Sequence, residues 1–231
     1  LSIGALVGLL ADKDGTLLPL ASWGAGTRRM AALQVAGAIE ASTRLTVIDE
    51  IERGLEPYRL RQLLDVLASD DQQCFLTTHS PIVIAAAKAA ALWYMDGSGR
   101  IGELHQEKVA RQQSRDPETF LSRVPIIAEG VTEVGFVRTL LRLVFNRQEY
   151  IYGIRVADGG GNDAMLGLLE ALHSAGINAA GFCDDEGRFP GRWQKLKNSA
   201  GAKLFQWPSG CLEENIIAHV SDDQLLSLAF D

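Results

Sequence analysis

Two pairs of acidic residues in this chain follow short apolar runs, an arrangement that can hold divalent metal ions. One run ends at Glu129, with Glu133 four residues later, and another ends at Asp184, with Glu186 two residues later. The carboxyl ends of parallel strands share one edge of a sheet, so we expect these four side chains to converge there. Carboxylates that would otherwise repel one another bind hard cations such as Mg²⁺ or Mn²⁺. Two such ions suit phosphodiester cleavage, because one activates water and the other stabilises the leaving oxygen.

Each of these acids also has an ordinary structural explanation when it is taken alone. Glu133 stands in the first turn of an expected helix, where an acid complements the helix dipole. Asp184, Asp185 and Glu186 could form a polar turn. Their joint placement at strand ends within one βαβα unit favours the metal site, and Asp185, which lies between two ligands, is expected to face away.

A second set of candidate residues stands earlier in the chain. An apolar run ends in Asp49 and Glu50, and the next apolar run is followed by Thr77–Pro81, which contains His79. Asp49 could hold Mg²⁺ through water, and Glu50 could orient and deprotonate the water that attacks a nucleotide. His79 could then sense the γ-phosphate. The acid pair alone would indicate a solvated strand end with a structural histidine nearby, but the Thr-Thr-His-Ser-Pro turn favours nucleotide hydrolysis.

Apolar periodicity predicts the elements that must position these residues. In the first part we expect strands within 1–20 and at 45–49, 73–77, 91–95 and 101–104, and helices at 27–42, 57–69 and 81–90. In the second part we expect strands near 125–129, 152–157, 178–183 and 203–206, and helices near 132–146, 163–175, 212–219 and from residue 222. This alternation implies an α/β fold with a mainly parallel sheet. Residues 106–123 are polar and are expected to be a linker, with a short helix from Pro117.

Composition places the chain among ordinary globular proteins. Its 231 residues, 47% of them hydrophobic and 22% charged, suffice for one large or two small domains. The net charge of −7 argues against a generally basic nucleic-acid coat but leaves DNA binding through metal-neutralised carboxylates open. Cys74, Cys183 and Cys211 have no metal-ligand spacing and are expected to be reduced thiols of a cytoplasmic protein. No apolar stretch approaches the roughly 20 residues of a membrane span, and no signal peptide is visible.

The earlier set of residues resembles the later half of the ABC-type ATPase heads of DNA-repair and phage-defence proteins. Such heads carry a glycine-rich signature, then Asp-Glu-Pro-Glu, a Leu-His-Pro turn and Thr-Thr-His-Ser-Pro. The corresponding segments here are Ser22–Arg29, Asp49–Glu52, Gly54–Pro57 and Thr77–Pro81. Ile51 replaces the usual Pro and Glu56 the usual His, and either Ser22 with Gly24 or Gly24 with Gly26 would face the phosphate.

The phosphate-binding loop of such ATPases, G-x-x-x-x-G-K-[ST], does not occur in the 231 residues. That loop supplies the amides and the lysine that hold the phosphates, so we expect this chain alone neither to bind nor to hydrolyse ATP measurably. The chain begins with Leu1, and we expect the loop to lie upstream, which would make ATP a ligand of the full-length protein only.

The later acids resemble those of a Toprim domain, a module of topoisomerases, primases and certain nucleases. The matching pattern is Glu129-Gly130-x-Thr-Glu133, a glycine-rich turn, and Asp184-x-Glu186, in which Glu186 replaces the usual second Asp. An ABC-type ATPase followed by Toprim is the order found in the overcoming-lysogenisation-defect (OLD) family of nucleases. This resemblance implies that residues 1–105 are the C-terminal part of an ABC-type ATPase domain and that residues 124–231 are a Toprim nuclease domain, truncated at its C-terminus.

The resemblance also assigns roles by position. Glu129 would be a metal ligand or general base, Glu133, Asp184 and Glu186 would be metal ligands, and Glu213, ahead of Glu214, would complete the site. The implied activity is that of a Mg²⁺- or Mn²⁺-dependent DNA endonuclease or nickase in bacterial or phage defence and repair. DNA would be the partner, and the full-length protein would form a homodimer through its ATPase part. A basic catalytic residue is also expected, but the sequence does not identify it.

Basic and glycine-rich segments are the remaining candidates. Residues 187–203 contain no acid and carry Arg188, Arg192, Lys195 and Lys197. They could contact a DNA backbone without reading its sequence, or they could form a solvated surface loop. The segment 158–163 contains three glycines that could bring amides to a phosphate, or it could be a structural turn with a helix cap, which the resemblance favours.

Two other functions stay open. Another Toprim enzyme, similar to a primase or a topoisomerase, would share the scaffold, but the tyrosines lack the context of a nucleophile. These are Tyr58, Tyr94, Tyr150 and Tyr152. A non-catalytic, ATP-gated DNA-binding module would carry vestigial carboxylates, and the retention of all four acids argues against it. No membrane partner is expected.

Overall fold

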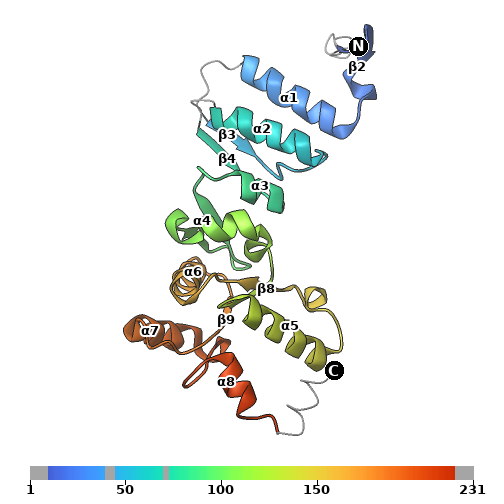
Figure 1. Cartoon of the computed structure of the whole chain (residues 1–231). Coiled ribbons are helices and arrows are strands. Elements are labelled where there is room, and N and C mark those ends of the chain that lie inside the picture. Colours follow the sequence, from blue (N-terminus) through green and yellow to red (C-terminus); the bar gives the residue numbers. More distant parts are fainter. Residues whose placement is uncertain (1–9, 40–44, 70–72, 222–231) are drawn as a thin grey trace. The chain divides into compact units, whose positions relative to one another are not determined.

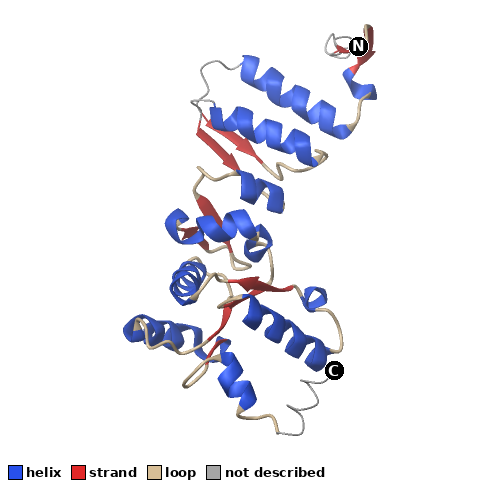
Figure 2. Cartoon of the chain, viewed as in Figure 1, coloured by secondary structure: helices blue, strands red, loops and turns tan. Residues whose placement is uncertain are grey.

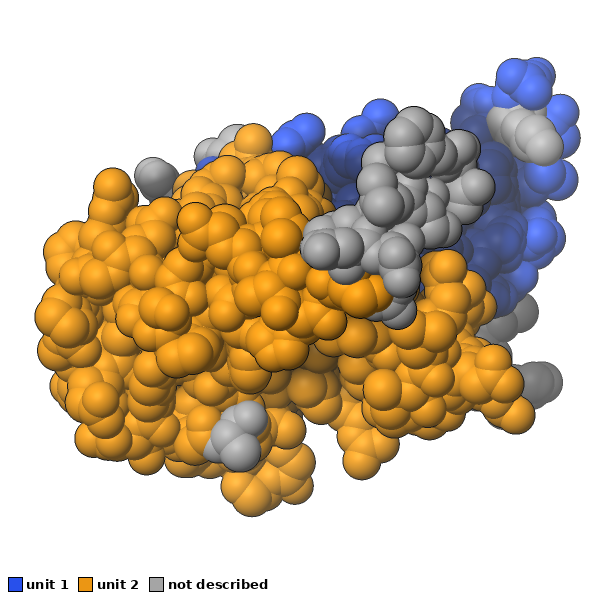
Figure 3. All heavy atoms as spheres, turned by 60° about the horizontal axis from the view of Figure 1, so that its bottom comes forward, with its two compact units in different colours: residues 1–87 blue, residues 88–231 orange. Residues whose placement is uncertain are grey.

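The computed structural model describes residues 10–39, 45–69 and 73–221 (Figure 1). The chain divides into two compact units, residues 1–87 (unit 1) and residues 88–231 (unit 2), which Figure 3 distinguishes by colour. Among the described helices, none combines the length and the apolar character that crossing a membrane requires.

Unit 1 is built on two parallel strands and the helices that follow them. Its strands are β1 (Leu10–Lys13), β2 (Thr16–Pro19), β3 (Leu45–Ile48) and β4 (Gln73–Leu76), and its helices are η2 (Leu20–Ser22), α1 (Ala25–Ile39), α2 (Pro57–Ser69) and α3 (Pro81–Ala86). The expected hairpin of β1 and β2 is present, and β3 pairs with β4 in parallel (Figure 2). Leu60, Leu63 and Leu64 of α2 are buried against Ile48 and Ile51, so the apolar stripe of α2 holds it to the end of β3.

Unit 2 contains a four-stranded parallel sheet with the order β10-β9-β7-β8 and a separate hairpin of β5 and β6. The strands are β5 (Leu92–Met95), β6 (Ile101–Leu104), β7 (Val124–Ala128), β8 (Ile154–Asp158), β9 (Ala180–Cys183) and β10 (Leu204–Gln206). The helices are α4 (Gln106–Arg115), η3 (Pro117–Phe120), α5 (Val131–Phe145), η4 (Glu149–Tyr152), α6 (Asn162–Ser174), α7 (Pro190–Ala200), η5 (Gly201–Lys203) and α8 (Leu212–Ile217). The mixed α/β fold and the parallel pairing are those the sequence predicts.

The strand order creates a topological switch between β7 and β9. The chain moves from β7 to β8 on one side, then returns past β7 to β9 and β10 on the other side. Right-handed crossovers therefore place α5 on one face of the sheet and α6 and α7 on the opposite face, and α6 contacts α7. The loops after β7 and β9 diverge to opposite faces, and this is where ligands bind in open α/β sheets.

The segment 106–123 is not a linker, contrary to the expectation from its polar sequence. It forms α4 and η3, and α4 buries Val109, Gln112 and Gln113 and packs on α6. The amide of Gln112 donates to Thr119 Oγ1 at 2.8 Å, which satisfies both groups inside the protein. Two of the three buried residues of α4 are amides rather than apolar side chains, so hydropathy alone missed this helix. The hairpin β5–β6 also belongs to unit 2, which places the boundary after Ala87 rather than after residue 105.

Other differences concern the extent of helices. The segment 187–203, for which a solvated surface loop was one alternative, contains α7, which begins at Pro190 and buries Trp193, Leu196 and Ala200. Those three residues have helical spacing, a signal that the surrounding basic residues obscured. Helix α3 ends at Ala86, four residues earlier than predicted. The predicted helix from residue 222 and the end of the first helix, 40–42, lie outside the described residues.

Candidate functional site

In unit 1, Thr77 joins the carboxyl ends of β3 and β4. Its hydroxyl donates to Asp49 Oδ1 at 2.6 Å and accepts from the backbone N–H of Glu50 at 2.8 Å. Glu50 has a φ of 46°, in the left-handed region that glutamate seldom adopts, so the chain turns sharply as it leaves β3. Asp49 and Glu50 thus lie at the end of β3, beside the end of β4. The hydroxyl of Thr77 fixes the Asp49 side chain.

Glu52 connects the turn after β3 to the segment that contains His79. Its two carboxylate oxygens accept from Thr78 Oγ1 at 2.7 Å and from the His79 backbone N–H at 2.6 Å. Burial raises the pKa of Glu52, but the hydrogen bonds from Thr78 and His79 outweigh it and leave the pKa below its ordinary value. Glu52 is therefore held ionised, and it fixes the backbone at His79. Sequence reasoning placed Glu52 in the motif without this role.

The structure shows the surroundings of Ile51, one of the two departures from the ATPase pattern, and of two glycines in the signature segment. Ile51, in place of the usual Pro, is fully buried in the core of unit 1 and removes no acidic group. Of the signature glycines, Gly26 is packed so closely that a Cβ there would overlap the carbonyl oxygen of Gly54. A Cβ at Gly24 would meet nothing within 4 Å. Gly26 is thus required for the packing of α1, and Gly24 is spatially open.

In unit 2, the predicted acids meet at the switch point. Ala128 of β7 pairs with Phe182 of β9, so Glu129 and Asp184 follow neighbouring strand ends. The backbone N–H of Asp184 donates to Glu129 Oε2 at 3.1 Å. The same environment includes the other three predicted ligands, since the charges of Glu133, Glu213 and Glu186 all act on Asp184.

Burial, and after it the crowding of negative charge, raises the pKa values of Glu129 and Asp184. Burial raises the pKa of Glu129, and the charges of Glu186 and Asp184 add to this, although hydrogen bonds from Asp184 and Asn162 oppose it. Burial also raises the pKa of Asp184, followed by the charges of Glu133 and Glu213. Asp184 Oδ1 is buried and accepts no hydrogen bond within the part of the chain that the structure describes. A cation would relieve both the repulsion and this unsatisfied oxygen, and carboxylate oxygens are the ligands that Mg²⁺ and Mn²⁺ prefer.

The acids are close to one another but do not form a finished ligand set. Across residues 10–39, 45–69 and 73–221, no three His, Cys, Asp or Glu side chains are placed to hold one metal ion together. Glu133 is engaged elsewhere, because its Oε2 accepts from the Gly130 N–H at 2.9 Å. This hydrogen bond lies at the cap of α5, whose cap residue is Gly130. Binding of an ion by Glu133 would require its side chain to leave this cap.

The two glutamates after Cys211 have different surroundings. Glu214 Oε2 accepts from the Cys211 N–H at 3.2 Å and so caps α8. Glu213 is exposed, and its charge raises the pKa of Asp184. Glu213 therefore remains the candidate ligand of this pair. Asp185 is exposed as well and accepts from the Gly187 N–H at 3.0 Å.

The glycine turn after β8 is structural, and its amides are not free to bind a phosphate. Gly159 N–H donates to Ala128 O at 2.7 Å, Gly160 N–H to Asp158 Oδ1 at 2.7 Å, and Gly161 N–H to Glu129 O at 2.8 Å. The phosphate-cradle alternative is therefore wrong. The turn instead ties the end of β8 to Glu129, and its next residue, Asn162, donates to Glu129 Oε2 at 3.3 Å.

The basic residues on and before α7 are partly neutralised. Arg192 donates to both oxygens of Glu170, at 2.9 and 2.8 Å, and Arg188 lies 3.5 Å from Glu186. No ion pair of Lys195 or Lys197 occurs among the described residues. Lys197, Arg188 and Asp185 line a shallow hollow of about 150 Å³ beside the end of β9. The lysines are thus better placed than the arginines for contact with an anionic ligand.

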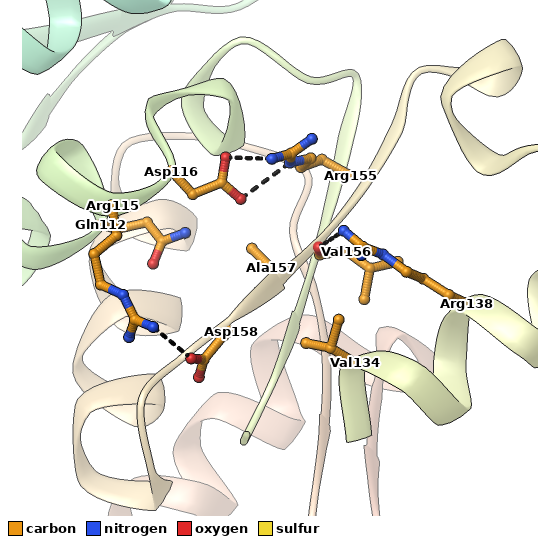
Figure 4. A pocket seen from close by; sticks show the side chains of 9 residues that line it. All are labelled: Gln112, Arg115, Asp116, Val134, Arg138, Arg155, Val156, Ala157 and Asp158. Carbon is orange, nitrogen blue, oxygen red and sulfur yellow. Dashed lines mark hydrogen bonds and ion pairs between the residues drawn. The ribbon is translucent and has the colours of Figure 1, made fainter. Parts of the chain in front are cut away.

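A second pocket, of about 220 Å³, lies between α4, α5 and β8 (Figure 4). Three arginines line it, and each is matched by an acid: Arg115 lies 3.0 Å from Asp158, Arg138 3.5 Å from Glu149, and Arg155 2.8 Å from Asp116. The charges that line the pocket are therefore paired with one another. The Arg115–Asp158 pair joins α4 to β8, and the Arg155–Asp116 pair joins β8 to the residue between α4 and η3.

Comparison with known proteins bears on the first part of the chain. Residues 2–85 match the family model described as "AAA domain, putative AbiEii toxin, Type IV TA system". No curated protein sequence matches the chain. One solved chain, described as "Structural biochemistry of ATP-driven dimerization and DNA stimulated activation of SMC ATPases", is 18% identical over 48% of this chain and 74% of that chain, with a TM-score of 0.37, which is too low to establish a shared fold. The family match supports an ATPase-type domain of the ABC-like kind at residues 2–85 of this α/β chain.

Proposed function

We propose that this chain belongs to an ATPase-linked, divalent-metal-dependent DNA endonuclease or nickase of the OLD type, with unit 2 as a Toprim nuclease domain. The observation that carries the proposal is the contact of Glu129 with Asp184 at the β7–β9 switch point, where the charges of Glu133, Glu186 and Glu213 also act and where Asp184 has a buried, unsatisfied oxygen. A divalent cation would relieve the repulsion among these carboxylates, and carboxylate oxygens are ligands that Mg²⁺ and Mn²⁺ prefer.

Within this proposal, the residues divide into three groups. Asp184, Glu186, Glu133 and Glu213 would hold Mg²⁺ or Mn²⁺, and the ions when bound would promote attack of water on the phosphodiester. Glu129 would hold an ion or accept a proton from water, because its raised pKa brings it closer to the range in which a general base works. Lys195 and Lys197 would contact the DNA backbone, with Arg188 and Arg192 available only when their acids release them.

Unit 1 would act on ATP, and it would not carry out DNA cleavage. An ATPase-type domain implies ATP and Mg²⁺ as its ligands, with Asp49, Glu50 and His79 at the strand tips as the expected nucleotide-facing groups. We propose that they act in the full-length protein, with a phosphate-binding loop from another segment, and that this part mediates a homodimer.

The test of the nuclease is cleavage of a supercoiled plasmid with Mg²⁺, Mn²⁺ or EDTA. We compare the chain with its Glu129→Ala and Asp184→Ala variants, and with Glu103→Gln as a matched control, because Glu103 is an exposed acid of the β5–β6 hairpin. Metal-dependent nicking or linearisation that both alanine variants lose and the control keeps would establish the site. A folded protein that binds no Mn²⁺ in calorimetry and cleaves nothing would instead favour a non-catalytic DNA-binding module.

A further inference from the structure

Asn162 is a buried amide whose side chain does not serve the helix that it begins. It is 4% exposed and is the first residue of α6, and the cap position is Gly161, with no side-chain cap hydrogen bond. A buried amide needs partners for its donor and its acceptor, because an unsatisfied one costs about 1–3 kcal/mol. Asn162 finds these partners outside its own helix.

The two partners of Asn162 fix which way its amide faces. Trp193 Nε1 lies 3.1 Å from Asn162 Oδ1, and an indole N–H can only donate. Asn162 must therefore present its oxygen to Trp193, which leaves its NH₂ group to donate to Glu129 Oε2 at 3.3 Å. Trp193 is 4% exposed within α7, so the donor that sets this orientation is itself held by the core.

Glu129 Oε2 thus receives two N–H donors, from Asn162 and from the backbone of Asp184. These donors come from the segments after β8 and β9, while Glu129 follows β7. Donors that follow two neighbouring strands therefore hold one carboxylate oxygen of the residue that follows a third strand. These hydrogen bonds set the orientation of the Glu129 carboxylate before any ligand binds.

We propose that Asn162, oriented by Trp193, is a positioning residue that aims Glu129 at the divalent cation of the acidic site. The inference rests on the proposed function, because it assigns to Asn162 a hydrogen bond that orients Glu129, one of the proposed metal ligands. Outer hydrogen bonds of this kind orient metal ligands, and their loss costs about 10- to 100-fold in metal affinity. Nothing in the sequence pattern distinguishes Asn162 from an ordinary helix cap, which is why the contact appears only in three dimensions.

The test measures Mn²⁺ affinity by calorimetry, without DNA and without turnover. Asn162→Leu keeps the approximate volume and removes both hydrogen bonds, and we expect Mn²⁺ to bind about 10- to 100-fold more weakly. Trp193→Phe keeps an aromatic ring and removes only the N–H, so we expect a smaller loss. In the double variant the two losses should not add, because they act through one carboxylate.

Gln112→Leu is the matched control. Gln112 is 4% exposed and its amide donates to Thr119 at 2.8 Å, so this variant also replaces a buried, hydrogen-bonded amide in unit 2. It should be destabilised and yet bind Mn²⁺ as the parent does. If Asn162→Leu fails to fold, the Trp193→Phe variant carries the test.

The outcomes separate this inference from the proposed function. Parent protein that binds Mn²⁺, with both the Asn162→Leu and Trp193→Phe variants binding equally well, overturns the role of Asn162 and leaves the nuclease proposal standing. Parent protein that binds no Mn²⁺ overturns both. A loss shared equally by Gln112→Leu would show a general effect of destabilisation and would also overturn the positioning role.

Discussion

The acids after β3 and the acids after β7 and β9 occupy the same kind of place, the carboxyl end of a parallel strand, but their surroundings are opposite. Asp49 and Glu52 receive hydroxyl and backbone N–H donors, and the pKa of Glu52 lies below its ordinary value. Glu129 also accepts two N–H donors, but burial and the charges of neighbouring carboxylates raise the pKa values of Glu129 and Asp184. The number of carboxylates does not decide how an acidic site behaves, because the balance of donors and like charges around each one does.

This difference indicates what each site lacks. The carboxylates of Asp49 and Glu52 already accept hydrogen bonds from Thr77, Thr78 and His79, so they are held in a defined geometry before a nucleotide and its metal arrive. The unit 2 acids carry an excess of negative charge together with the unsatisfied Asp184 Oδ1, so they are arranged to gain stability from a cation. Four predictions test this contrast.

The largest expected effect is stabilisation by Mn²⁺. At about 100 times its dissociation constant, a bound ion stabilises the folded state by about 2.7 kcal/mol. We expect Mn²⁺ to raise the thermal unfolding temperature of the parent chain accordingly, and we expect Asp184→Asn to lose this increase. Asp185→Asn is the control, because Asp185 is the exposed neighbour that accepts from Gly187. A full Mn²⁺ shift in Asp184→Asn would contradict the assignment of this residue.

Removal of the Thr77 hydroxyl should be costly in unit 1. Thr77→Val leaves Asp49 Oδ1 without its donor and the Glu50 N–H without its acceptor. We expect a loss of about 1–3 kcal/mol in the free energy of unfolding, measured by urea titration. Thr16→Val, on the exposed strand β2, should change this quantity by less than about 0.5 kcal/mol. Equal effects of the two variants would show that the Thr77 bridge contributes nothing particular.

The two sites should respond to pH in opposite directions. The lowered pKa of Glu52 means that its stabilising contribution is present above its unfolded pKa and is lost as the pH falls through its folded pKa. Glu52→Gln should therefore be less stable than the parent by about 1 kcal/mol at neutral pH, and equal to it in acid.

The raised pKa of Glu129 means that its contribution is present below its unfolded pKa and is lost as the pH rises through its folded pKa. Glu129→Gln, without divalent ions, should match the parent in acid and become the more stable of the two as the pH rises to neutral. Thermal melts between pH 4 and pH 8 measure both variants. A pH response of the same sign in both would refute the contrast between the sites.

The smallest expected effect concerns an acid whose partners are cations. Glu170 of α6 binds Arg192 of α7 and Lys108 of α4, and these partners lower its pKa, with Arg192 the larger cause. Glu170→Gln should cost about 0.5–1 kcal/mol and increase hydrogen exchange in α4. Glu107→Gln, an exposed residue of α4, is the control. Unchanged exchange in α4 would mean that its other contacts in unit 2 suffice to hold it in place.

Several features of this protein were determined by its sequence alone. The strands that end at Glu129 and Asp184, the helix Pro57–Ser69 and the parallel pairing were predictable, because periodicity and strand length are local properties of the chain. The sequence likewise placed the acids at strand ends. It did not place α7, where Trp193, Leu196 and Ala200 form an apolar stripe among basic residues.

Only the tertiary structure decided which strand ends are neighbours and which polar groups meet. The order β10-β9-β7-β8 brings Glu129 beside Asp184 and creates the switch point, and no local pattern encodes a pairing between segments more than fifty residues apart. The contact of Gln112 with Thr119, the use of all three glycine amides after β8 and the contact of Asn162 with Glu129 have the same origin. Hydrogen bonds between distant segments depend on the path of the whole chain, whereas the ends of strands and helices depend on a few adjacent residues.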